Sequence, residues 1–127
     1  GRTREEVLSA STPDTRRMLE LVAELAKEQG LELRETPLGL VLAYPERKWL
    51  ATVYFDPYTY LEVYIQEHRN HGWDRDADTS IAALRRITTK RLPPKHPAVP
   101  ATDVVAHWHA VREVLVGMAA LYRSSQT

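Results

Sequence analysis

Residues 49–66 read WLATVYFDPYTYLEVYIQ, and this stretch decides the fold. Its first part, 49–55, is a dense run of apolar and aromatic residues, and its last part, 60–66, alternates between apolar and polar residues. Both patterns predict β-strands, and the Asp56-Pro57 pair between them is typical of a turn. Two strands joined by so short a connection pair antiparallel, so this stretch predicts a β-hairpin.

Two further strand-like runs come before this hairpin. Residues 31–34 alternate between apolar and charged side chains, and residues 38–44 are almost continuously apolar, which is typical of a central strand. Residues 45–48 form a turn between the second run and the hairpin. Short turns between consecutive strands predict an antiparallel meander of three or four strands.

Helical patterns lie on both sides of the meander. Residues 13–29 have Thr12 as a capping residue, Pro13 at the first position and Gly30 at the end. Residues 103–123 form a second long helical pattern. Each pattern has one apolar face, formed by Met18, Leu21, Val22 and Leu25 in the first helix and by Val104, Trp108, Val111, Leu115, Met118 and Tyr122 in the second.

Three other segments have weaker patterns. Residues 3–10 have capping-box spacing at Thr3 and Glu6, and they form either a short helix or a loose terminus. Residues 78–88 predict a short helix that begins at a capping aspartate. Residues 91–100 contain four prolines, which exclude a helix and a central strand, so we expect an extended connector on the surface.

The element order α-β-β-β(-β)-α-α predicts an α+β fold. We expect two layers, an antiparallel sheet of three to four strands with the N-terminal and C-terminal helices packed on one face. At 127 residues the chain is long enough for one domain, residues 1–127, and too short for two. It begins with Gly-Arg-Thr-Arg rather than methionine, so we expect a fragment or accessory domain of a larger protein.

Composition excludes several classes of protein. The chain has no cysteine, which removes disulfides, thiol catalysis and thiolate metal sites and fits a cytoplasmic protein. Its apolar runs are too short to span a membrane. Net charge is zero, so any attraction to nucleic acid must be local. Arginine outnumbers lysine 13 to 4, which is typical of a GC-rich bacterial genome.

Residues 67–76 read EHRNHGWDRD and hold two histidines three positions apart. His68 and His71 reach one zinc ion only if they lie on a helical turn, and an acid of the same stretch must then add a ligand. Zinc proteases have a glutamate between their histidines, whereas Glu67 precedes both here. We therefore expect a polar loop that leaves the last strand and binds no metal.

Patterns for catalysis are incomplete. Asp56 and Glu62 bracket a strand, as the acids of a magnesium-dependent nuclease do, but the lysine of that motif is missing. His107 and His109 point about 200° apart on a helix and cannot share a metal. No nucleophile elbow or phosphate-binding glycine loop is present, so no catalytic residue or cofactor is assigned.

Three tyrosines of the hairpin region form the first candidate binding surface. If Leu61, Val63 and Ile65 face the helices, the residues that point away are Leu50, Thr52, Tyr54, Tyr60, Glu62 and Tyr64. Tyrosines on an open sheet face are typical of protein interfaces and also stack on nucleic-acid bases. The carboxylate of Glu62 repels phosphate, which favours a protein partner. We expect Trp49 and Trp73 to close the ends of the core.

A run of cations forms the second candidate surface. Residues 81–127 carry seven cations and two anions, net +5. Five cations fall within eleven positions that hold no acid: Arg85, Arg86, Lys90, Arg91 and Lys95. Such a run binds phosphates, contacts an acidic partner or is simply solvated.

These features predict a non-catalytic binding domain. It would contact another protein, or the rest of its own chain, through the tyrosine-bearing sheet face or an exposed edge strand. The alternative is a nucleic-acid-binding module that uses the basic residues 85–95. A third hypothesis is a metal-dependent hydrolase that uses Asp56, Glu62 and either His68 or His71. The sequence does not indicate an oligomeric state.

Overall fold

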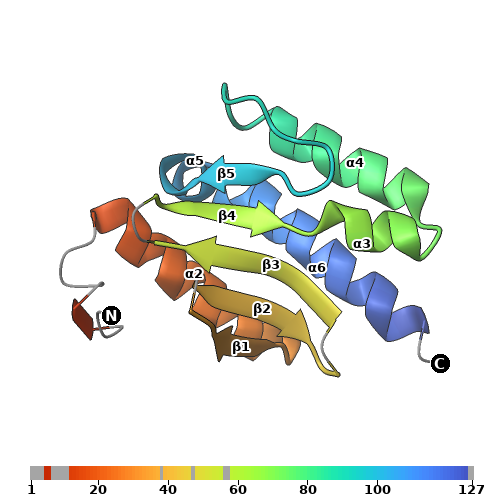
Figure 1. The fold of residues 1–127 in the computed structure, drawn as a ribbon, viewed down its shortest axis with the longest axis horizontal. Helices are drawn as coiled ribbons and strands as arrows, with labels where there is room; N and C mark the ends of the chain where they lie inside the picture. The colour runs from red at the N-terminus through yellow and green to blue at the C-terminus, as the bar shows by residue number, and fades with distance from the viewer. Residues whose placement is uncertain (1–4, 7–11, 38, 47, 56–57, 126–127) are drawn as a thin grey trace.

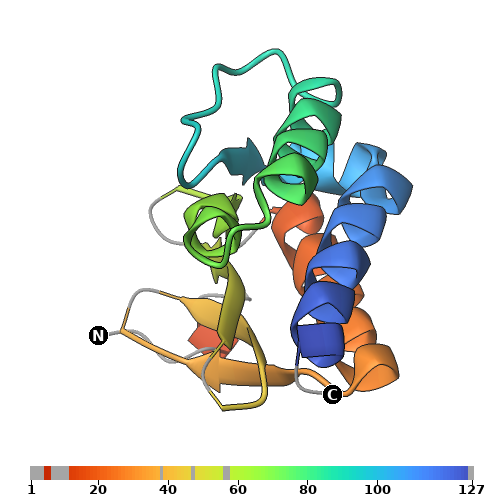
Figure 2. The same ribbon diagram turned by 90° about the vertical axis from the view of Figure 1, so that its right-hand side faces the viewer.

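The computed structural model describes residues 5–6, 12–37, 39–46, 48–55 and 58–125. It contains one antiparallel sheet, with helices gathered on one of its faces (Figures 1 and 2). The predicted α+β class and two-layer packing are therefore confirmed. Of the predicted helix at 3–10 only residues 5–6 belong to the described part, and they are helical. The predicted turn at Asp56-Pro57 lies outside the described residues.

The sheet has five strands in the order in which they occur along the chain. They are β1 (Glu32–Glu35), β2 (Leu40–Tyr44), β3 (Lys48–Tyr54), β4 (Tyr60–Val63) and β5 (Ala98–Pro100). Every neighbouring pair is antiparallel, so the predicted meander is confirmed for β1 to β4. Figure 1 views this sheet from the face that helices α2, α4, α5 and α6 leave uncovered.

The fifth strand comes from the proline-rich connector. Val99 pairs with Leu61 of β4 and is fully buried. The sequence predicts only an extended connector here, because three residues are too few to show a strand pattern. The prolines are tolerated because β5 is an edge strand, where one side of the backbone needs no partner.

The first long helix, α2 (Pro13–Gln29), matches its prediction at both ends. The hydroxyl of Thr12 accepts a hydrogen bond from the backbone N–H of Thr15, and Gly30 closes the helix with a φ of 65°. All four residues of its predicted apolar face are buried. Their burial holds the helix against the sheet, because an isolated helix of this length is marginal in water.

The predicted C-terminal helix is two helices rather than one. α5 (Ala101–Ala106) ends at His107, whose φ of −123° is not helical, and α6 (Trp108–Ser125) follows directly. The break lets α5 pack on α2 and β4 while α6 runs along α2 and across β3. The predicted apolar stripe is buried apart from Trp108, which is half-buried against the core.

The stretch EHRNHGWDRD is not a loop, so that prediction is wrong. It forms most of α3 (Ile65–Asn70), a tight turn, and the beginning of α4 (Asp74–Arg85). Gly72 makes the turn with a φ of 81°, and the N–H of Trp73 donates to the carbonyl of His68. Helix α4 begins four residues before the predicted start. His68 is fully buried, because its ring packs as an aromatic core residue.

The core lies between the sheet and the helices. The sheet contributes Leu40, Leu42, Leu50, Ala51, Val53, Leu61, Val63 and Val99, and the helices contribute Met18, Leu25, Ile65, Ile81, Leu84, Val104, Leu115 and Met118. Burial of this apolar surface is the main contribution to the stability of the fold. Within the described residues, no helix combines the length and apolar character needed to cross a membrane.

Candidate interaction surface

The three predicted tyrosines lie together on the sheet face opposite the core. We call this surface, made of Thr52, Tyr54, Tyr60, Glu62 and Tyr64, the tyrosine face. Its position follows from strand alternation: the intervening residues of β3 and β4 are fully buried, whereas the three tyrosines and the glutamate are half-buried. The register places the first two tyrosines opposite each other, and their rings stack with centroids 4.8 Å apart.

Hydrogen bonds connect Tyr54 and Tyr64 to neighbouring side chains of the tyrosine face. The hydroxyls of Thr52 and Tyr64 form a short hydrogen bond, and the hydroxyl of Tyr54 donates to the carboxylate of Glu62 at 3.5 Å. Burial raises the pKa of Tyr54, Tyr60 and Tyr64, and the negative charge of Glu62 raises it further. All three hydroxyls are protonated at neutral pH, so each can donate a hydrogen bond.

A β-bulge changes which residues of β3 face outward. Leu42 pairs with Ala51 but the next residue of β2, Ala43, pairs with Trp49, so Leu50 is the extra residue. Leu50 is fully buried in the core, and its predicted place on the tyrosine face is wrong. Trp49 is 42% exposed and its ring lies 5.9 Å from that of Tyr64, so it extends this surface rather than closing the core.

Trp73 behaves as predicted. Its ring is half-buried, packs against the core and contacts the ring of Tyr122 on α6.

A hollow of about 330 Å³ opens beside the tyrosine face. It is lined by Trp49, Tyr64, Glu67 and His96. The ring of His96 meets Tyr64 edge-on at 5.2 Å, and its buried Nδ1 has no hydrogen-bond partner among the described residues. Three aromatic rings and one carboxylate therefore surround a space large enough for a side chain.

His96 has no signal in the sequence that marks it as part of this surface. It belongs to the proline-rich connector and approaches Tyr64 only when β5 pairs with β4.

The basic residues at 85–95 lie along one exposed segment. Arg85 is in the last turn of α4, and Arg86, Lys90, Arg91 and Lys95 follow in the connection to β5. All five are exposed, and none forms an ion pair with a described residue. Buried Ile87 and Leu92 anchor the segment to the core.

This basic segment reaches the tyrosine face. The carbonyl of Lys95 accepts a hydrogen bond from the N–H of Gln66 at 3.0 Å, and the carbonyl of Pro97 accepts one from Val63 at 2.9 Å. These bonds hold the end of the segment alongside the end of β4 and the start of α3. In Figure 1 the connection rises from α4 and returns to the sheet at β5. Both predicted surfaces therefore meet at one edge of the molecule.

Two described residues of the hydrolase hypothesis, Glu62 and His68, do not come together. His68 is buried between α3 and α6, on the helix side of the sheet, whereas Glu62 lies on the tyrosine face. Asp56 lies outside the described residues. No three His, Asp or Glu side chains of the described part are close enough to hold a metal ion. His107 and His109 are both exposed on either side of Trp108.

No protein-family model, no curated protein and no solved structure matches this chain. Its function is therefore inferred from the chemistry of the surfaces described above.

Proposed function

We propose that this chain is a non-catalytic binding domain that holds a basic segment of another protein, or of its own longer chain, on the tyrosine face. The observation that carries the proposal is the hollow formed by Trp49, Tyr64, Glu67 and His96 at the edge of that face. The occupant would place an arginine or lysine side chain in the hollow and lay apolar side chains over the stacked tyrosines.

Aromatic residues support a protein partner. Tryptophan and tyrosine are enriched at protein interfaces and among the residues that dominate binding energy. The pair Tyr54 and Tyr60 is already stacked, and Tyr64 is already hydrogen-bonded. Because these side chains lose little freedom on binding, a partner meets a smaller entropic cost.

Charge supports a basic occupant. Glu62 is in the middle of the tyrosine face and Glu67 lines the hollow. A cation held over a tryptophan or tyrosine ring gains about 0.5–2 kcal/mol, and a neighbouring carboxylate adds to this attraction. The same carboxylates repel the phosphates of a nucleic acid, so the centre of this face favours a protein.

A selection of displayed random peptides on the purified protein tests this proposal. We expect the enriched peptides to carry arginine or lysine beside apolar residues. Trp49→Ala should weaken their binding by about tenfold or more, because it removes an aromatic wall of the hollow. Glu67→Gln should weaken binding by about two- to fivefold, as expected for a charge at the rim of an interface.

Two matched variants serve as controls. Tyr58→Ala removes an aromatic side chain that is 75% exposed and does not line the hollow. Glu24→Gln removes an exposed acid from α2 in the helix layer. Neither should change binding. Enrichment of acidic peptides, or equal binding to Trp49→Ala and to the unchanged protein, would overturn the proposal.

Nucleic-acid binding is the second candidate, and one observation favours it. The five exposed cations of the basic segment have no ion-pair partner among the described residues, and the segment ends beside the aromatic rings of the tyrosine face. Cations that follow a phosphate backbone, next to rings that stack on bases, are the usual parts of a single-strand binding surface.

Fluorescence anisotropy with labelled single- and double-stranded oligonucleotides tests this second function. Binding should weaken steeply as salt increases. Alanine at Arg86, Lys90 and Arg91 together should reduce the salt slope by about two to three, because each cation that neutralises a phosphate releases about one counterion. Absence of binding at low salt would reject the nucleic-acid function and leave the proposal of a protein partner.

A further inference from the structure

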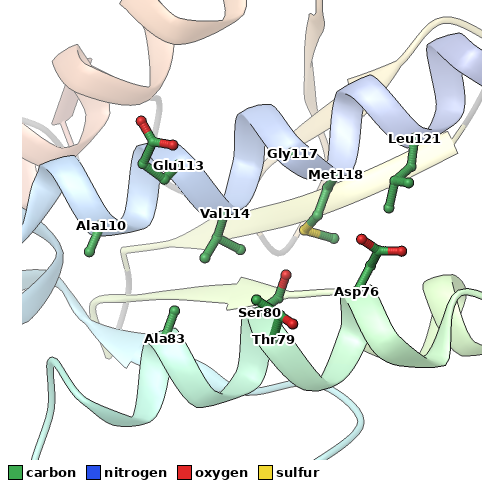
Figure 3. Close-up of a pocket in the computed structure, with 10 residues that line it drawn as sticks. All are labelled: Asp76, Thr79, Ser80, Ala83, Ala110, Glu113, Val114, Gly117, Met118 and Leu121. Atoms are coloured by element: carbon green, nitrogen blue, oxygen red, sulfur yellow. The ribbon is translucent and has the colours of Figure 1, made fainter.

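We propose that the groove between α4 and α6 binds an amphipathic, positively charged helix of a partner protein. The groove lies in the helix layer (Figure 3), whereas the tyrosine face belongs to the sheet, which is the other layer of the molecule (Figure 2). Its volume is about 440 Å³, and its lining comes only from these two helices. The proposal is therefore independent of the function proposed above.

The floor of the groove is apolar, and several residues on its sides have small side chains. Figure 3 shows Val114 and Met118 of α6 and Ala83 of α4 directed into the gap between the helices. Ala110 and Leu121 mark its extent along α6, a separation of roughly 16 Å at the usual helical rise. A trough of that length matches about three turns of a partner helix, whose apolar side chains recur on one face.

Gly117 indicates that a partner molecule approaches α6 closely at this position. Glycine in the middle of a helix lowers stability relative to alanine, so it needs a reason. A Cβ atom built on Gly117 would meet no other atom within 4 Å, and packing within the protein therefore does not require glycine here. Glycine instead leaves the floor of the groove open, which lets the backbone of a partner helix come near.

The negative charges that line the groove favour a positively charged partner. Two carboxylates line it, Asp76 on α4 and Glu113 on α6, and no cation does. Among the described residues Asp76 has no ion pair, and Glu113 has only a 3.9 Å contact with the exposed ring of His109. Lysine or arginine side chains that flank the apolar face of a partner helix would pair with these carboxylates.

A second copy of this chain fits the groove less well. A symmetric dimer through this groove would place the same surface on both sides of the contact. Asp76 and Glu113 would then face the same two carboxylates of the other copy, and like charges at an interface oppose association.

A helical peptide probe tests the proposal. The probe has about 18 residues, long enough to form a helix, with leucine and alanine on one face and lysine on the other. A second probe has glutamate in place of every lysine. Binding of each is measured by fluorescence anisotropy to the unchanged protein and to Gly117→Leu, which fills the groove where the structure has open space.

The lysine probe should bind saturably and about tenfold more weakly to Gly117→Leu, because the new side chain occupies its place. Asp76→Asn should weaken it by about two- to fivefold. Ala120→Leu is the matched control, because Ala120 is exposed on the same helix but does not line the groove, and binding to it should not change.

Three results would overturn the proposal. The first is equal binding of the lysine probe to Gly117→Leu and to the unchanged protein, or no binding to either. The second is tighter binding of the glutamate probe. The third is self-association of the protein that Gly117→Leu abolishes, which would make a second copy the occupant.

Discussion

The ring of His68 has no exposed surface, although histidine is polar and titratable. It meets the rings of Trp73 and Tyr122 edge-on, at centroid distances of 5.3 Å each. Neither ring nitrogen has a hydrogen-bond partner among the described residues. His68 therefore acts as a core aromatic residue and stays neutral, because a charged ring would lose its hydration without compensation.

Because of this histidine, the protein should become less stable as the pH is lowered. Burial, together with the nearby His71, lowers the pKa of His68 to about 4, although Asp76 opposes the shift. Below pH 6.5 the unfolded chain binds a proton at this residue and the folded chain does not, down to about pH 4. This residue alone should reduce the free energy of unfolding by about 3 kcal/mol over that range. Urea unfolding at a series of pH values measures the loss.

The variant His68→Leu separates this effect from the titration of other groups. It nearly keeps the volume of the side chain and removes its proton-binding site. Between pH 6.5 and pH 4 its stability should fall by about 3 kcal/mol less than that of the unchanged protein. Parallel stability curves for the two proteins would show that His68 titrates normally in the fold.

At the level of elements, two glycines should respond to alanine with opposite signs. Gly39 directly precedes β2. A Cβ atom at this position would lie 2.1 Å from the carbonyl oxygen of Val53 on β3. The backbone of the sheet would have to move, so Gly39→Ala should lower the free energy of unfolding by about 1–3 kcal/mol or more. Chemical denaturation gives this value directly.

Gly117→Ala should instead stabilise the protein. The position is exposed within α6 and its Cβ would meet nothing within 4 Å. Alanine restricts the unfolded chain and favours the helix, so the free energy of unfolding should rise by roughly 0.5–1 kcal/mol. A destabilised Gly117→Ala would mean that the backbone at this position needs glycine and would remove one support of the proposed groove.

The elements with strong local signals can be predicted from the sequence. Helix α2 is predictable at both ends because Thr12, Pro13 and Gly30 mark them. Helices α3 and α4 have no such marks: their N-terminal capping residues are Tyr64 and Trp73, and neither makes a side-chain capping bond. His68 is also a polar residue type, which hides the apolar face of α3 from a periodicity argument.

Some features of the candidate site can likewise be predicted from the sequence, and others cannot. Strand alternation is local, so it correctly predicts that Tyr54, Tyr60 and Tyr64 share one face. The bulge that exchanges Leu50 for Trp49 has no sequence pattern of its own, and it depends on the pairing of β2 with β3. The approach of His96 to Tyr64 and the groove between α4 and α6 arise only from packing between elements distant in sequence.

The whole molecule has zero net charge, but its three candidate binding surfaces differ in local charge. Carboxylates are at the tyrosine face, at the aromatic hollow and along the α4–α6 groove, whereas the segment 85–95 carries five exposed cations and no acid. The sheet face and the helix groove are on opposite layers, so occupation of one does not block the other (Figure 2). If both proposed surfaces bind their partners, the domain would join two partners, or two parts of one partner.

The three tryptophans are built-in reporters for the most direct test. Trp49 is beside the tyrosine face, whereas Trp73 and Trp108 pack against the core. Their indole N–H signals can be followed by NMR in isotope-labelled protein while the best enriched basic peptide is added. If the tyrosine face is the binding surface, the signal of Trp49 should shift with saturation and those of Trp73 and Trp108 should stay in place. Shifts of the other two with an unchanged Trp49 would contradict it.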